Sequence, residues 1–444
     1  MAPIVALIFC VILVIVLLRM ERGRNPEASA AVWVPTLWLM LCGSKPLGRW
    51  FGSGASMVMV GNEEAGSPHD RLVLSILIIL ALLIVYRRRI KWSWILKDNF
   101  WLILLFLYLG SSILWSDFPL VSFKRWMRLC GAIPIALVVL SERSPLKALE
   151  SVFRRCAYVL IPFSLLLIKY FPDFGVEYSR EGTKMWVGVA SQKNSLGVIC
   201  ALSAFLIVWA FLREWRAGDL FKSRSQAFAE GLVLAIAMFL LHGFRGAYPA
   251  TAIGFLIVGV ASLLLLYRMK NNVRHMATFL VLMVAVGLLC LFFGGSLVPT
   301  VTSAFQRDES FTGRSDIWRM VLDVASRNSL LGVGYGGYWG LQDEEIHSTV
   351  GVTESHSGYL DVYLEVGIVG ILLLLAFLLA HYRRALGELN HAYDWALFGI
   401  SLLMMTLIHN FTESNFLRTS SYFWNVTVFV TIALSAPCML TTKD

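Results

Sequence analysis

Three residues in this sequence are candidates for chemistry because of their type and their neighbours. His356 lies between two serines, and imidazole titrates near neutral pH, so it can accept a proton from an attacking hydroxyl group. Arg314 lies in FTGRSDIW and Arg245 lies in GFRG. A guanidinium group matches the oxygens of phosphate in pairs. Two arginines and a base brought together would therefore suit a reaction that holds a phosphate or diphosphate beside a hydroxyl group.

Each of these residues also has a purely structural explanation. Arg245 separates two apolar runs and could extend to lipid headgroups, although the glycines on either side favour the approach of a bulky anion. His356 precedes an apolar run and could likewise face headgroups. Arg314 could form an ion pair with an acidic neighbour, namely Asp308, Glu309 or Asp316.

Five further polar residues are candidates for substrate binding: Lys193, Asn194, Asp361, Glu365 and Glu413. Asp361 and Glu365 are four residues apart and share one face of the helix expected after His356. Two carboxylates inside an apolar run are costly, so they imply partners or a function. Either they orient His356 and pair with arginines, or they line a path for ions; we expect pairing.

The composition places these residues in a membrane protein. Of the 444 residues, 57% are hydrophobic and 15% are charged, whereas soluble domains carry about 45–50% apolar and about 25% charged residues. About twelve or thirteen apolar runs match the length of a membrane-spanning helix. They lie near 2–18, 31–43, 71–86, 99–115, 126–140, 153–170, 195–212, 230–243, 247–267, 276–294, 358–381, 395–410 and 420–438. We therefore expect an all-α, polytopic bundle, with the first run retained as a span and not removed as a signal peptide.

The net charge of +9 does not indicate nucleic-acid binding, because the basic residues are spread over short loops between alternate apolar runs. Positive charge collects on the cytoplasmic side of membrane proteins. This rule places the N-terminus and residues 295–357 outside and the C-terminus inside. The seven cysteines lie within or beside apolar runs without a CxxC spacing, so we expect neither disulfides nor a metal site.

The sequence divides into three regions. Residues 1–294 should hold about ten spans, residues 295–357 one large outer loop with short helices, and residues 358–444 the last spans. Within the loop, residues 316–328 have helical spacing with Ser315 as the N-cap. Residues 332–340 (GVGYGGYWG) contain too much glycine for a helix and should form a turn that lets the backbone approach a ligand.

Several segments together resemble one family, the O-antigen ligase and polysaccharide polymerase superfamily of bacterial oligosaccharide transferases. The resemblance covers most of the chain from about residue 100 onward, and its most specific elements are FTGRSDIW and the segment that starts at His356. GSKPLGRWFG (43–52) also resembles the branch associated with exopolysaccharide production. The segments are LWSDFPLVSFKR (114–125), GVASQKNSLG (188–197), GFRG (243–246), FTGRSDIW (311–318), LLGVGYGGYW (330–339), HSGYLDVYLEVGIVG (356–370) and HNFTESNF (409–416).

The resemblance implies a role for each candidate. Arg245 and Arg314 would hold the diphosphate of an undecaprenyl-linked oligosaccharide donor, and His356 would activate the hydroxyl of a glycan acceptor, which is a lipid-linked chain or lipid A–core. Such an enzyme would invert the anomeric centre, would need no metal or cofactor, and would work at the periplasmic face of the bacterial inner membrane. Chain-length regulators or export proteins are further expected partners.

The chain departs from the family pattern in two places. His242-Gly243-Phe244 precedes Arg245 where a serine pair is more common, and Asn328-Ser329 replaces a frequent proline. Neither change removes a charged group. A different class of function, a flippase for lipid-linked sugars or a polysaccharide transporter, would also suit a chain with many spans. It predicts polar residues along several helices at the membrane midplane and an internal repeat, and we find neither in the sequence.

Overall fold

The computed structural model describes residues 2–50, 67–88, 90, 92–178, 182–218, 224–243, 249–293, 308–339 and 354–435. Arg245 lies outside these residues, so its predicted position beside the diphosphate is not described. The predicted outer loop 295–357 is described only at 308–339 and 354–357.

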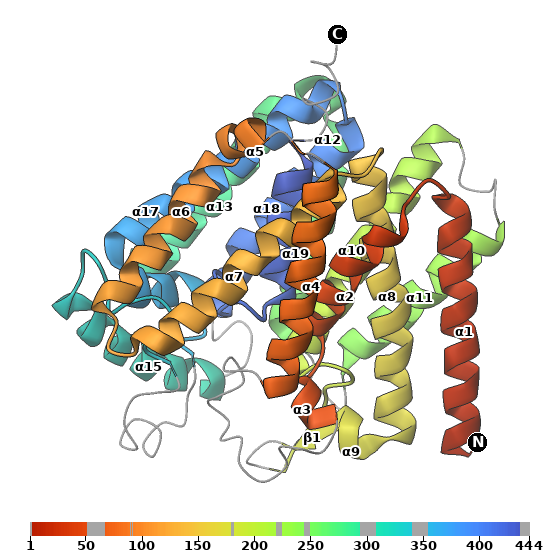
Figure 1. Ribbon diagram of the computed structural model, residues 1–444, viewed down its shortest axis with the longest axis horizontal. Coiled ribbons are helices and arrows are strands. Elements are labelled where there is room, and N and C mark those ends of the chain that lie inside the picture. Colours follow the sequence, from red (N-terminus) through yellow and green to blue (C-terminus); the bar gives the residue numbers. More distant parts are fainter. Residues whose placement is uncertain are drawn as a thin grey trace.

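The described chain is almost entirely helical, as predicted (Figure 1). Every apolar run named above coincides with a helix. The long helices are α1 (Pro3–Arg24), α2 (Trp33–Gly43), α4 (Pro68–Arg87), α6 (Phe100–Ser111), α7 (Pro119–Leu140), α8 (Pro145–Tyr170), α10 (Lys193–Ala217), α11 (Arg224–His242), α12 (Ala250–Arg268), α13 (Val273–Phe293), α17 (Gly358–Gly387), α18 (Tyr393–Thr412) and α19 (Tyr422–Ala433). The remaining elements named here are α3 (Leu47–Trp50), α5 (Trp92–Asp98), α9 (Pro172–Gly175), α15 (Asp308–Arg327) and the antiparallel strands β1 (Val176–Tyr178) and β2 (Lys184–Trp186).

Nine helices within the described residues are long and apolar enough to cross a membrane, and three shorter apolar helices accompany them. The helix α7 is long but carries Lys124, Arg125 and Arg128 in its outer half. These elements confirm a polytopic α-helical membrane protein, in which the shorter helices account for the difference from the predicted count of twelve or thirteen.

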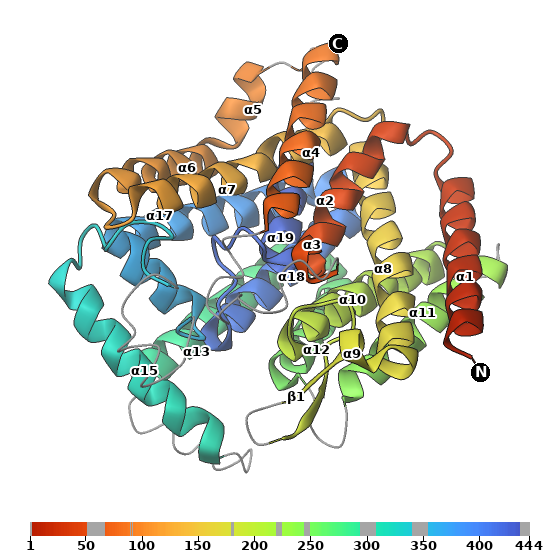
Figure 2. The ribbon, with the colours of Figure 1, turned by 60° about the horizontal axis from the view of Figure 1, so that its bottom comes forward.

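The helices divide into an inner and an outer set. In the apolar windows of α8 and α18, 83% of the residues are buried within the protein, against 22% in α1 and 11% in α13. Both ribbon views show α18 and α19 in the middle of the bundle and α1 at its edge (Figures 1 and 2). The outer helices expose large apolar side chains, which is what a lipid-facing surface requires. Helices from before residue 294 and after residue 358 pack together, because α12 lies against α18 and α7 against α19.

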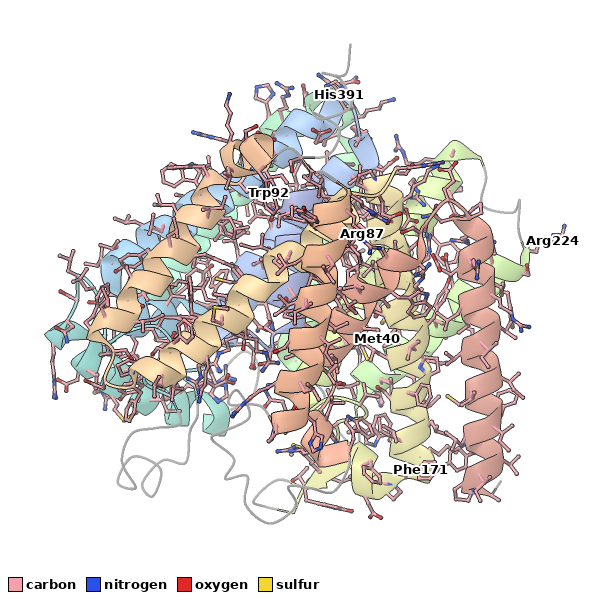
Figure 3. All side chains as sticks on the ribbon, viewed as in Figure 1. Met40, Arg87, Trp92, Phe171, Arg224 and His391 are labelled. Carbon is pink, nitrogen blue, oxygen red and sulfur yellow. The ribbon has the colours of Figure 1, made fainter. Side chains whose placement is uncertain are left out.

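One end of the bundle is held by buried ion pairs between four helices. Arg24 and Arg154 both contact Glu230, at 2.7 and 2.8 Å, and Arg155 contacts Glu21 at 2.7 Å. A further pair, Arg213–Glu150 at 2.7 Å, joins α10 to α8. These pairs tie α1, α8, α10 and α11 together at the end predicted to face the cytoplasm. Figure 3 shows Arg87, Trp92 and His391 toward one end of the bundle and Phe171 toward the other, as the predicted alternation of loops requires.

The helix predicted at 316–328 is longer than expected. The structure extends it back to Asp308, so Ser315 lies inside α15 and not at its N-cap, and Arg314 lies on a helix and not in a loop. The apolar side of α15 packs on α17 through Ile317, Val321 and Ala325.

The glycine-rich segment forms the predicted turn, but its glycines make room for the protein itself. A Cβ atom at Gly332 would lie 2.5 Å from the carbonyl carbon of Glu365, and one at Gly336 would lie 2.8 Å from Cδ of Arg125. Both glycines have positive φ angles, 70° and 65°, which other residues rarely adopt. The expected close approach to a ligand is thus, in this structure, a close approach to α17 and α7.

This turn joins α17 where the helix is broken. Gly367 has φ 62° and ψ −164°, which interrupts the helical hydrogen bonds. The freed groups find partners in the segment before the turn: Ile368 N–H donates to the Ser329 carbonyl at 2.9 Å, and Val369 N–H donates to the Leu330 carbonyl at 3.3 Å. Irregular backbone at membrane depth is tolerated when neighbouring groups satisfy it in this way.

Candidate active site

A cavity of about 490 Å³ opens at the end of the bundle opposite the ion-pair network. Segments that are far apart in the sequence line it, and all of them come from stretches predicted to lie on the outer side or at the outer ends of spans. The polar lining includes Ser44, Glu177, Asn194, Glu354, His356, Glu413 and Arg418. The positions of these segments agree with the topology deduced from the basic loops.

His356 is held on the cavity wall in an unusual backbone conformation. Its φ angle is 54°, in the left-handed region that non-glycine residues seldom occupy. The two neighbouring serines are fully buried and fix this turn. Ser355 Oγ donates to the Ser357 carbonyl at 2.8 Å, and Ser355 N–H donates to Asp361 Oδ1 at 3.1 Å. Backbone strain of this kind persists only where the surroundings enforce it, and it often marks functional sites.

Two carboxylates lie on one side of the imidazole ring. His356 Nδ1 is 3.1 Å from Glu354 Oε1 and 3.9 Å from Glu413 Oε2. Burial opposes the charged form of the ring, but the two carboxylates outweigh burial and raise the pKa of His356 to about 10. Burial also opposes ionisation of Glu354, yet Arg418 and His356 lower its pKa to about 2. Both carboxylate contacts engage Nδ1, so Nε2 is the ring nitrogen available for a substrate.

Glu413 connects three elements at this site. Its Oε1 atom accepts a hydrogen bond from Asn194 Nδ2 of α10 at 2.8 Å and lies 3.5 Å from Nη2 of Arg314 on α15. Its backbone carbonyl accepts from Gly358 N–H at the start of α17. Three of the predicted residues, Asn194, Arg314 and Glu413, are therefore brought together with His356.

Asp361 contacts an arginine of this cluster without lining the cavity. Its Oδ2 atom lies 2.8 Å from Nη2 of Arg418, and Nη1 of the same arginine lies 3.4 Å from Glu354 Oε2. Asp361 is buried and does not appear in the cavity lining. Of the two arrangements considered for this carboxylate, pairing with an arginine is the one present in the structure.

Three predicted residues, two of them outside this cluster, do not line the cavity. Lys193 begins α10 beside Asn194 but is not part of the cavity lining. Glu365 is half-buried, and its backbone carbonyl accepts a hydrogen bond from Gly334 N–H of the glycine turn at 2.8 Å. Arg314 also stays behind the cavity wall, where Nη1 donates to the Thr412 carbonyl at 3.0 Å.

Glu354, Arg418 and Arg128 line the cavity but were not among the predicted residues. Glu354 begins the ESHSG segment, two residues before His356. A carboxylate this close in sequence to a candidate base could have been predicted to contact it. Arg418 follows Glu413 by five residues on the same outer segment. Arg128 lies inside an apolar run, where a charge is itself an indication of function.

The sequence Asn410-Phe411-Thr412 matches a glycosylation acceptor, but Asn410 cannot serve as one in this fold. Its side chain is 1% exposed, and its Oδ1 atom accepts hydrogen bonds from the backbone N–H groups of Asn415 and Phe416 at 3.0 and 2.9 Å. Its role is to close the loop that presents Glu413.

Glu354, His356 and Glu413 also have the composition of a metal site, since one atom from each lies within 4.8 Å of the others. However, each of the two carboxylates already contacts an arginine. Arg418 contacts Glu354 at 3.4 Å and Arg314 contacts Glu413 at 3.5 Å. A divalent cation placed here would be repelled by two guanidinium groups, so the donor set does not fit a resident metal.

Comparison with known proteins gives one family match. Residues 231–375 match the model of the O-antigen ligase family. This region is similar to the O-antigen ligase family. The match spans Arg245, Arg314, His356, Asp361 and Glu365, and it confirms the resemblance to the O-antigen ligase superfamily that the sequence motifs indicated.

A relative extends the similarity beyond that region. The chain is 24% identical over 317 residues to the exopolysaccharide production protein ExoQ of Rhizobium meliloti (strain 1021). The aligned part is 68% of this chain and 70% of the relative. An O-antigen ligase region in a multi-pass helical bundle thus has a relative named for exopolysaccharide production.

Proposed function

We propose that this protein is a glycosyltransferase that moves an oligosaccharide from undecaprenyl diphosphate to a sugar hydroxyl group at the outer face of the bacterial inner membrane. One observation carries the proposal: His356, with Glu354 and Glu413 against one ring nitrogen, lines a cavity at the membrane end that the basic loops mark as external. The O-antigen ligase region around this histidine supports it.

Within this chemistry, we favour polymerisation of an exopolysaccharide. The support is the relative named an exopolysaccharide production protein and the segment GSKPLGRWFG, of which Ser44, Pro46 and Arg49 line the cavity. Ligation of O-antigen to lipid A–core would use the same reacting groups and differ in the acceptor.

The proposed reaction needs a base on one side of the anomeric carbon and positive charge on the other. The acceptor oxygen forms a bond to the anomeric carbon while His356 Nε2 takes its proton. The bond from that carbon to the diphosphate oxygen breaks, and the electron pair leaves with the diphosphate. Arg314 and Arg245 would neutralise the leaving group, as oriented cations do for developing charge. Attack from the face opposite the leaving group inverts the anomeric centre.

The site can supply this charge from its own residues, so we propose that transfer is independent of metal ions. Diphosphate is already a good leaving group, and orientation of the acceptor provides much of the remaining acceleration. The buried contacts of Glu413 with Asn194 and Arg314 would hold the base and the cation at a fixed separation.

A transfer assay tests the proposal directly. The full-length protein is reconstituted in vesicles with purified undecaprenyl diphosphate-linked oligosaccharide, and the length of the glycan product is followed over time. We expect His356→Ala to slow transfer by about 10²–10⁴-fold, the usual contribution of a general base. His391→Ala, an exposed histidine at the other end of the bundle, is the matched control and should retain activity.

Two results would contradict the proposal. Transfer by His356→Ala at the wild-type rate would remove the base from the mechanism. Movement of the lipid-linked saccharide across the vesicle membrane, without formation of any new glycosidic bond by the wild type, would assign the protein to the transporter class.

A further inference from the structure

The outer half of α7 carries three basic residues with different surroundings. Lys124 is exposed on the outside of the helix. Arg125 is buried and donates to the backbone carbonyls of Gly336 and Trp339 in the glycine turn. Arg128 lies one turn further along, half-buried, and lines the cavity.

The other arginines of the cavity wall have partners. Arg49 contacts Glu177 at 3.5 Å, Arg418 contacts Asp361 and Glu354, and Arg125 is held by carbonyls. Within the part of the chain that the structure describes, Arg128 makes neither a hydrogen bond nor an ion pair, and its Nε atom is buried without a partner.

The carboxylates that line the cavity also have partners. Asp70 accepts from the backbone N–H groups of Leu47 and Ser67 and from the Ser67 hydroxyl group. Glu354 and Glu413 lie against His356 and their arginines, and Glu177 faces Arg49. Among the described residues of the cavity, Arg128 is therefore the one arginine with neither a hydrogen-bond nor an ion-pair partner.

The position of Arg128 along α7 makes an unpaired charge there unfavourable in free energy. Arg128 is the tenth residue of α7, which places it about 13–14 Å along the helix axis from Pro119. A charged side chain within a membrane-spanning segment faces a polar cavity or a partner and commonly marks a substrate site. Here it faces the cavity, so the missing partner is best supplied by a ligand.

We propose that Arg128 binds a phosphate group of the polyprenyl diphosphate-linked substrate. This inference rests on the proposed function for the identity of the lipid-linked substrate. The guanidinium fork matches phosphate oxygens bidentately. A position about 13–14 Å along α7 from Pro119 suits the diphosphate, which lies near the bilayer surface, better than the saccharide, which extends outward. Arg128 would thus provide positive charge inside the cavity, in addition to the charge of Arg314, which does not itself line the cavity.

Binding of undecaprenyl diphosphate without a saccharide tests this assignment. The probe is titrated against full-length protein in nanodiscs of uncharged lipid, for the wild type and for Arg128→Gln, Arg128→Lys and Lys124→Gln. We expect Arg128→Gln to raise Kd at least tenfold and Arg128→Lys to have a smaller effect, because lysine keeps the charge but not the fork. Lys124→Gln removes the same charge from the exposed face of the same helix and should bind as the wild type does.

Thermal melting separates binding from folding. If Arg128→Gln and Lys124→Gln have the same melting temperature, the weaker binding by Arg128→Gln is due to loss of the ligand contact. If Arg128→Gln melts at a lower temperature, the Kd of Arg128→Lys, which retains the charge, is compared with that of the wild type instead. A Kd for Arg128→Gln within twofold of the wild type overturns the assignment. So does failure of the wild type to bind the probe.

A second arm distinguishes phosphate from the carboxylate of an acidic sugar. An oligogalacturonide is titrated against the same variants. Weaker binding of this glycan by Arg128→Gln, with unchanged binding of undecaprenyl diphosphate, overturns the phosphate assignment. The readout does not require transfer. A wild type that binds the lipid through Arg128 but joins no saccharides would refute the proposed function and leave the inference intact.

Discussion

The guanidinium group of Arg418 lies 2.8 Å from the carboxylate of Asp361, and this pair joins the first turn of α17 to the loop after α18. The same arginine contacts Glu354, which in turn contacts His356. The position of the imidazole therefore depends on a residue that does not itself line the cavity.

We expect Asp361→Asn to destabilise the protein and to slow transfer. Removal of one partner from a buried ion pair costs roughly 3–5 kcal/mol, and solvent reaches part of Arg418, so we expect about 2 kcal/mol. The melting temperature and the transfer rate of the reconstituted protein measure the two effects. The exposed pair Asp323–Arg327 gives the control, since surface pairs contribute little and Asp323→Asn should melt as the wild type does. Equal melting of the two variants would show that the Asp361 pair does not support the site.

The pH dependence of transfer should report the protonation of His356. Its pKa is raised to about 10, so at pH 7 the ring carries a proton and cannot accept another. If the ring acts as the base, the rate should increase about tenfold per pH unit from pH 7 and level off near pH 10. Glu354→Gln removes one of the carboxylates that raise this pKa, so its profile should level off at lower pH.

The opposite profile would give His356 a different role. A rate that stays constant to pH 9 and then falls would mean that the protonated ring is the active form and acts as a cation beside the diphosphate. Melting temperatures measured across the same pH range separate either profile from unfolding.

Gly332→Ala should destabilise the region that holds α15. Alanine at φ 70° costs about 1–2 kcal/mol from the left-handed conformation alone, and its Cβ would lie 2.5 Å from the Glu365 carbonyl carbon. Gly387→Ala is the matched control, because a Cβ there meets nothing within 4 Å and the residue ends a helix. We expect a lower melting temperature for the first variant and an unchanged or higher one for the second. The reverse order would contradict the described packing of the turn.

Chelation of divalent metals should leave transfer unchanged. The carboxylates that could hold a cation already contact Arg314 and Arg418. Transfer measured with EDTA and after addition of magnesium or manganese tests this expectation. A loss of activity with EDTA that one of these metals restores would mean that Glu354, His356 and Glu413 bind a cation during the reaction.

The helices could be predicted from the sequence because a membrane span requires little more than length and apolarity. His356, Asn194 and Glu413 could be selected because each is polar and adjoins a span at the outer side, and Arg314 because it lies in FTGRSDIW in the outer loop. The structure brings these four together within one cluster of contacts.

The pairing of charges could not be predicted, because it depends on how segments pack in three dimensions. Arg418 contacts residues 57 and 64 positions earlier in the chain, and no periodic pattern relates these positions. The predicted start of α15 was wrong because FTGRSD has the composition of a loop, whereas the structure packs the helix on α17 and extends it back to Asp308. Arg128 was missed because a charge inside an apolar run gave no indication of which side of the helix faces a cavity.

The break in α17 at Gly367 has a mechanical consequence. Four main-chain hydrogen bonds join residues 329–334 to α17 on both sides of the break, from Leu364 and Glu365 to Ile368 and Val369. At about 1 kcal/mol each, they resist separation by roughly 4 kcal/mol. Because α15 ends just before this junction and His356 lies two residues before the start of α17, a force that tilts α15 is transmitted through the junction to the histidine. A tilt of α15 would therefore displace the base together with Arg314, which contacts Glu413, and leave their spacing intact.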